Sequence, residues 1–255
     1  MTTLAPLDRT TAPRPSVLRR TAVAVTGVLS CALPTVWTAG TVVELATGAE
    51  RDHLFHQLTG QGLLLGALWL GALLPLLVAG WRGRRPSAVA GALHLAVVAG
   101  ALVAGALAPG NGGLFVAALV PITGALVWAA LPLRPRIVPS GLDPVLAPLA
   151  LAAAALFVPF VFTEAALQRG MGDEHAQFSH YFDMAWISVA LVLAAVAAAT
   201  VPAARRLALW AMLGIAVTGG ARFAFTPETT WSLLALGLGV LGAAATALRL
   251  ARRAG

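Results

Sequence analysis

Apolar runs of about 20 residues repeat along almost the whole chain, separated by short segments rich in Arg, Pro, Gly or acidic residues. A helix of about that length spans the hydrocarbon core of a bilayer. Only helices and closed barrels can cross this core, because every backbone N–H and C=O group needs a partner within the protein. The repeated runs therefore predict an all-α, polytopic membrane helical bundle.

We expect eight transmembrane helices and almost no soluble domain. A hydrophobic content of 59% leaves too few polar residues to cover a soluble globule of this size. The break between the sixth and seventh runs depends on Pro202 and the pair Arg205 and Arg206, and without it the count falls to seven. The expected spans are 20–43, 60–81, 87–108, 113–133, 143–165, 184–202, 205–222 and 230–250.

The first run begins like a secretory signal, but no small-x-small cleavage site follows promptly and further spans come after it. We therefore expect a retained helix. The single cysteine, Cys31, lies within this run, which excludes an intramolecular disulfide and any CxxC metal or redox site.

The basic residues predict the orientation. All 17 are Arg, and they cluster at alternate ends of the expected spans, with only Arg51, Arg169 and Arg222 on the other side. The positive-inside rule then places both termini in the cytoplasm of a multi-pass protein of the cell membrane. Since the clusters lie between apolar runs and not along one basic face, we expect lipid and no nucleic acid as the partner.

The two halves of the chain show a similar order of residues. A helix ending in Glu44 precedes a loop with histidine and a helix with Trp69, and a helix ending in Glu164 precedes a similar loop and a helix with Trp186. This order predicts two parallel four-helix repeats. The expected parts are a cytoplasmic tail over 1–19, a membrane unit over 20–133, a linker over 134–142, and a second unit over 143–255 with a short cytoplasmic tail.

Acidic residues and histidines gather on the side opposite to most arginines. We therefore expect any polar chemistry at the outer face. The residues concerned are Glu44, Glu50, Asp52, His53, His56, Glu164, Asp173, Glu174, His175, His180, Asp183 and Glu228.

Three of these carboxyls are candidate catalytic groups. Glu44 shares a helix side with Trp37, and Glu164 follows Phe160 by one turn, so each carboxyl is expected beside aromatic surface. A poorly hydrated carboxyl can keep its proton and act as a proton donor near neutral pH. The alternative is that both residues mark the membrane–water boundary.

Asp183 is the third candidate. His180 precedes it and Trp186 follows it by three residues each, which places an acid, an imidazole and an indole on one helix face. Such a pair could relay a proton or bind a metal, and the alternative is a hydrated helix start.

Three tryptophans are candidate substrate-binding residues, together with Phe160. Trp37, Trp69 and Trp186 fall at or inside apolar spans, where indole faces could stabilise a carbocation by cation–π attraction. They could equally be interfacial or packing residues.

The histidines form a candidate metal site of lower specificity. His53 and His56 are three residues apart and suit one helix face, whereas His175 and His180 are five apart and do not. We therefore expect solvated histidines here, with no metal and no other cofactor, and a Zn²⁺ or Cu²⁺ site at these four residues as the alternative. His94, inside the third span, is either functional or makes an interhelical hydrogen bond to a Ser, Thr or backbone carbonyl.

The chain combines several spans with isolated acids beside aromatic residues, and it lacks DDxxD motifs. In these features it resembles the small integral-membrane terpene cyclases that act by protonation without Mg²⁺. The resemblance covers architecture only, and the fungal members have seven spans. It implies acid–base cyclisation or isomerisation, a lyase or isomerase activity on a lipid-soluble, isoprenoid-like substrate. A membrane-associated upstream enzyme would supply that substrate. The Arg-only, Ala-rich composition is typical of high-GC bacteria, in which secondary metabolism is common.

Two other classes of function remain open. Prolines inside several spans are typical of transporters or permease components with discontinuous helices. The outer histidines are typical of extracytoplasmic proteins that handle metal or haem.

Overall fold

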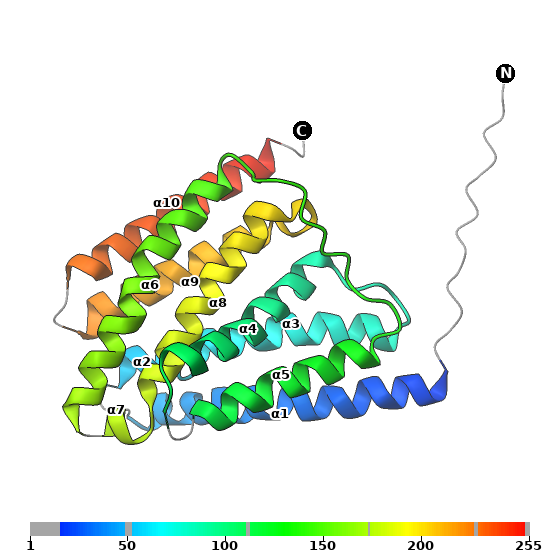
Figure 1. Ribbon diagram of the computed structural model, residues 1–255, viewed down its shortest axis with the longest axis horizontal. Helices are drawn as coiled ribbons and strands as arrows, with labels where there is room; N and C mark the ends of the chain where they lie inside the picture. The colour runs from blue at the N-terminus through cyan, green and yellow to red at the C-terminus, as the bar shows by residue number, and fades with distance from the viewer. Residues whose placement is uncertain (1–15, 49–52, 111–112, 173, 227–228, 253–255) are drawn as a thin grey trace.

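The protein is an all-helical bundle in the computed structural model, which describes residues 16–48, 53–110, 113–172, 174–226 and 229–252 (Figure 1). The long helices are α1 (Val17–Thr47), α3 (Leu63–Trp81), α4 (Ala88–Leu107), α5 (Gly113–Ala130), α6 (Leu146–Met171), α8 (His180–Thr200), α9 (Leu207–Phe225) and α10 (Thr230–Ala251). The short ones are α2 (Leu54–Leu58), α7 (Glu174–Gln177) and the 3₁₀ turn η1 (Pro202–Ala204).

The expectation of eight spans is confirmed, because eight helices in the described part are long and apolar enough to cross a membrane. The chain is thus a multi-pass helical membrane protein. The sixth and seventh spans are separate: Val201 has an extended backbone, as the residue before a proline prefers, and Pro202 begins η1. Most of the expected cytoplasmic tail, residues 1–15, lies outside the described residues.

The long helices form two groups of four. In the first group, α1, α3, α4 and α5 pack in a closed ring, and α6, α8, α9 and α10 do the same in the second. Both groups show the same order of a long helix, a short helix and a long helix, in α1–α2–α3 and α6–α7–α8. This order is what a parallel repeat would produce, and the duplication itself stays a prediction.

The packing of α4 against α8 joins the two groups. A Cβ atom on Gly100 would lie 3.1 Å from the Trp186 ring and 3.2 Å from Ala190, so a small residue permits this close approach. The indole N–H of Trp186 donates to the backbone oxygen of Val97 at 2.7 Å. The fully buried core of the bundle therefore lies along α8.

The bundle has two chemically different ends (Figure 1). At one, called here the arginine end, α1 begins, α3 ends and α10 ends. At the other, called the histidine end, lie α2, α7 and the first residue of α8, His180. The polar residues of the two ends thus lie a full helix length apart.

At the arginine end, Asp143 joins three segments of the second group. Its Oδ1 accepts the backbone N–H groups of Val145 (3.1 Å) and Leu146 (3.3 Å) at the start of α6. Its Oδ2 accepts from Arg249 Nη2 at 2.8 Å and lies 3.0 Å from Arg205 Nε. Burial raises the pKa of Asp143, but the bonds from Arg249, Val145 and Leu146 outweigh it and hold the pKa below its ordinary value.

We predict that Asp143→Asn destabilises the protein by about 1–3 kcal/mol at neutral pH, because two partly buried guanidinium groups lose their counter-charge. The pKa of Asp143 is lower in the folded protein than in the unfolded chain, where it is about 3.9. Its contribution to stability is therefore present above the unfolded pKa and is lost as the pH falls through the folded pKa. The difference in thermal unfolding between wild type and variant in detergent should therefore shrink in acid. Arg206→Gln, at an exposed neighbour of Arg205, is the control and should melt like the wild type. An Asp143→Asn variant as stable as wild type at neutral pH would contradict the prediction.

Candidate metal centre

Four histidines that are distant in sequence meet at the histidine end. His53 immediately precedes α2 and His56 lies within it, while His175 lies in α7 and His180 begins α8. Ring centroids are 4.9 Å apart for His53 and His175, 5.4 Å for His175 and His180, and 5.1 Å for His56 and His175. The cluster draws on both groups of helices.

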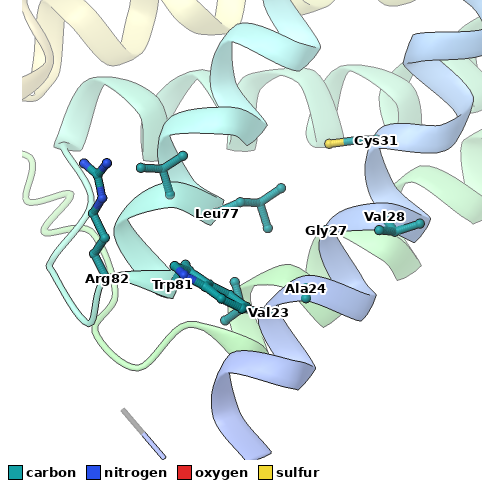
Figure 2. A pocket seen from close by; sticks show the side chains of 9 residues that line it. Val23, Ala24, Gly27, Val28, Cys31, Leu77, Trp81 and Arg82 are labelled. Atoms are coloured by element: carbon teal, nitrogen blue, oxygen red, sulfur yellow. The ribbon is translucent and has the colours of Figure 1, made fainter. Parts of the chain in front are cut away.

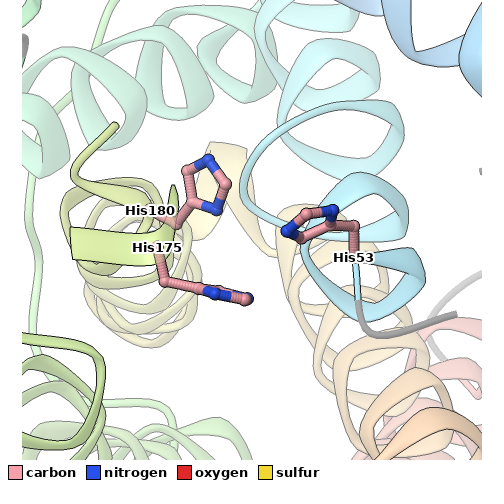
Figure 3. A group of neighbouring side chains, drawn as sticks. All are labelled: His53, His175 and His180. Atoms are coloured by element: carbon pink, nitrogen blue, oxygen red, sulfur yellow. The ribbon is translucent and has the colours of Figure 1, made fainter. Parts of the chain in front are cut away.

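Three of these side chains lie close enough together to be candidate ligands of one metal ion (Figure 3). One ring nitrogen each of His53, His175 and His180 lies within 4.8 Å of the other two. Nitrogen ligands on one tetrahedral zinc ion are about 3.4 Å apart, given Zn–N bonds of about 2.0–2.1 Å. Small side-chain rotations would therefore bring all three imidazoles onto one ion. His175 and His180 are buried and His53 is half-buried.

A break in the helix explains how histidines five residues apart face the same point. Ser179, between α7 and α8, has a left-handed backbone with φ 58° and ψ 39°. A continuous helix would point His175 and His180 in different directions, and the turn at Ser179 removes that constraint. Strained, non-glycine residues of this kind are often found at functional sites.

Two polar side chains lie beside the three nitrogens. The side-chain amide of Gln61 lies 2.8 Å from Nε2 of His180, so it can orient this ring as outer partners of metal ligands do. His56 is buried, and its Nδ1 makes no hydrogen bond to any described residue. A neighbouring imidazole with an unused nitrogen could serve as a fourth ligand.

The three candidate catalytic carboxyls lie in three different environments. Glu44 is exposed and accepts a hydrogen bond from Gln57 Nε2 at 2.9 Å. Asp183 is buried and makes no hydrogen bond or ion pair to the described residues, including His180 one turn earlier. The expected outer acids Glu50, Asp52, Asp173 and Glu228 lie outside the described residues.

Glu164 is part of a buried ion pair. Its Oε2 accepts from Arg222 Nη1 at 2.7 Å, and its Oε1 accepts from Gln168 Nε2 at 2.7 Å. The Arg222 guanidinium is surrounded by aromatic rings, with its carbon 4.9 Å from the Phe160 centroid and 5.3 Å from that of Phe55. Phe160, expected to bind substrate, thus packs on an arginine of the protein itself.

The tryptophans expected to bind substrate do come together. The Trp186 ring centroid is 5.1 Å from Trp69 and 6.1 Å from Trp37, and Phe182 joins the cluster at 5.9 Å. Trp69 and Trp186 are buried and Trp37 is half-buried. These rings fill the junction of α1, α3 and α8.

His94 makes an interhelical hydrogen bond, as one alternative expected, but its partner is Trp128 of α5 and not a Ser, Thr or backbone carbonyl. The indole N–H of Trp128 donates to Nδ1 of His94 at 2.9 Å. The neutral ring then carries its proton on Nε2, which is buried without a hydrogen bond to the described residues.

Arg222 is the main residue of this region to which sequence reasoning gave no role. The sequence did contain a signal, because Arg222 ends an expected span and an arginine at membrane depth needs a carboxylate partner. Which carboxylate it meets depends on how α6 and α9 pack.

We predict that Glu164→Gln destabilises the protein by about 3 kcal/mol, because it replaces the buried carboxylate that accepts from the Arg222 guanidinium at 2.7 Å with a neutral amide. Thermal unfolding in detergent measures this loss. The double variant Glu164→Gln/Arg222→Gln should be less destabilised than the sum of the two single variants. Glu44→Gln, at an exposed carboxyl with a similar amide partner, is the matched control and should change stability little. Additive single effects would show that the pair is not coupled.

Comparison of the chain with family models, with curated proteins and with solved structures gives no match. At the coarsest level, the residues and the fold identify a helical protein with eight apolar spans.

Proposed function

We propose that this chain is a membrane protein that binds a transition metal ion through His53, His175 and His180. The observation that carries the proposal is that one nitrogen of each imidazole lies within 4.8 Å of the other two. His53 comes from the connection between α1 and α3, and His175 and His180 from the connection between α6 and α8, so two segments distant in sequence bring their imidazoles to one point.

The chemistry of the ligands limits the metal. Imidazole nitrogens suit zinc, copper, nickel and iron, whereas calcium and magnesium prefer oxygen ligands. Three protein ligands leave one position of a tetrahedral ion open, as in sites that exchange a ligand or activate water. If His56 moves in as the fourth ligand, the site closes and only stores or senses the ion. We therefore propose Zn²⁺ or Cu²⁺ as the ions to test first.

The proposed site faces the outside of the cell. The arginine end carries the Arg clusters that the positive-inside rule assigns to the cytoplasm, so the histidine end is extracytoplasmic. A metal ion there is accessible without crossing the membrane. Handling of an extracytoplasmic metal is accordingly the function that we favour.

We predict that the full chain, purified in detergent and freed of metal with a chelator, binds about one Zn²⁺ or Cu²⁺ ion. His53→Asn, His175→Asn and His180→Asn should each lower affinity by more than about a hundredfold, beyond the loss caused by outer partners. Elemental analysis and competition titration measure stoichiometry and affinity. His94→Asn, at a buried histidine remote from the cluster, is the control. Equal binding by the triple His→Asn variant and the wild type would overturn the proposal.

A second candidate is a membrane enzyme that acts on a hydrophobic substrate by acid–base chemistry. The observation that favours it is Asp183, buried without a partner among the described residues and one turn before Trp186. Burying an ionised carboxylate alone is costly, so this group is suited to hold a proton. It would protonate an alkene or epoxide of a lipid-soluble, isoprenoid-like substrate, and the indole faces would stabilise the cation.

For this enzyme, we predict that Asp183→Asn abolishes conversion while leaving expression and metal binding unchanged. Membranes containing the protein would be incubated with isoprenoid alkenes and epoxides, and products identified by mass spectrometry. Glu44→Gln is the matched exposed control. Full conversion by Asp183→Asn would exclude Asp183 as the acid, and absence of conversion by the wild type would leave the metal proposal standing alone.

A further inference from the structure

A groove opens between α1 and α3 at the arginine end (Figure 2). Its volume is about 470 Å³, and its lining includes Gly27 and Cys31 of α1 and Leu77 and Trp81 of α3. Leu77 packs closely on Gly27, because a Cβ atom there would lie 3.1 Å from the Leu77 side chain. In a membrane, an apolar groove of this kind faces the acyl chains of lipids.

One arginine lines this groove, and a second packs on a tryptophan that lines it. Arg82 follows α3 and is part of the lining. The Arg20 guanidinium lies over the Trp81 ring, 5.9 Å from its centroid, and Arg20 Nε is buried with no hydrogen bond within the described chain. Neither arginine forms an ion pair with an acid among the residues that the structure covers. The groove therefore ends in positive charge.

Other arginines nearby donate hydrogen bonds to backbone oxygens of the chain. Arg19 donates to the backbone oxygens of Ala130 (3.5 Å) and Leu131 (3.4 Å), and Arg85 donates to that of Arg134 at 2.9 Å. These bonds attach α1 and the end of α3 to the linker after α5. Arg20 Nε makes no such bond within the described residues.

A second groove shows what is specific about the first. It has a similar volume of about 520 Å³ and lies between α3 and α9 at the histidine end. Its lining includes Leu63, Leu64, Val217 and Phe225 and contains no charged residue. Any lipid tail could occupy either groove, so only the first can select a headgroup by charge.

We propose that the α1–α3 groove binds one anionic phospholipid. The acyl chain lies along Gly27, Cys31 and Leu77, and the phosphate accepts charge-assisted hydrogen bonds from Arg20 and Arg82. Basic pockets between transmembrane helices on the cytoplasmic side are suited to anionic headgroups. The site is independent of the histidines and lies at the opposite end of the bundle.

The single cysteine of the chain offers a direct assay, because Cys31 lines the groove. The full chain in detergent is treated with an apolar maleimide, and the rate of Cys31 alkylation is measured as lipid is added. Phosphatidylglycerol should protect Cys31 at a concentration about 25-fold lower than phosphatidylcholine with the same chains, or about fivefold for each arginine. Glycerol phosphate, which has the headgroup charge but no chain, should not protect.

Arg20→Gln and Arg82→Gln should each reduce the preference for phosphatidylglycerol about fivefold, and Arg82→Lys should retain most of it. Arg84→Gln is the matched control, since Arg84 is exposed and close in sequence but does not line the groove. Equal protection by the two lipids, or equal losses in Arg82→Gln and Arg84→Gln, would overturn the proposal. So would protection by glycerol phosphate alone.

Discussion

The hydrocarbon core of a bilayer offers no hydrogen-bond partner, so polar groups at that depth must find one inside the bundle. Hydroxyls do so locally: Ser188 and Thr218 donate to backbone oxygens one turn earlier, at 2.6 and 2.9 Å. Indoles do so across helices, since Trp186 donates to Val97 of α4 and Trp128 donates to His94. These bonds constrain the rotation of α4, α5 and α8 about their axes. They thereby help to position the polar residues at the two ends of the bundle.

Charged groups follow the same rule, and burying one without a partner costs more free energy than burying a neutral polar group. Asp143 is satisfied by two backbone N–H groups and two arginines at the arginine end. Glu164 is satisfied by Arg222 and Gln168 towards the histidine end. Against this background, polar groups without such partners stand out, because native proteins leave few of them. His56 Nδ1, His94 Nε2 and Arg20 Nε belong to this class within the described residues.

The two proposed sites arise where the helical pattern ends. The histidine cluster needs α2, α7 and the turn at Ser179, all of which are short or irregular segments between long helices. The α1–α3 groove lies beside the close contact of Gly27 with Leu77 and reaches Arg82, next to the last turn of α3. Long helices supply the rigid frame in both cases, and their ends and gaps supply the chemistry.

The sequence alone determined the helical class, the eight spans and the separation of arginines from histidines. These follow from length, hydropathy and charge, which depend on position along the chain and on the solvent, not on packing. Sequence reasoning also selected the residues that gather at the histidine end. It could not decide that Glu164 meets Arg222, that Trp37, Trp69 and Trp186 adjoin, or that His175 and His180 face His53. Those contacts depend on how the helices rotate about their axes and on the left-handed backbone of Ser179. Only tertiary packing decides both.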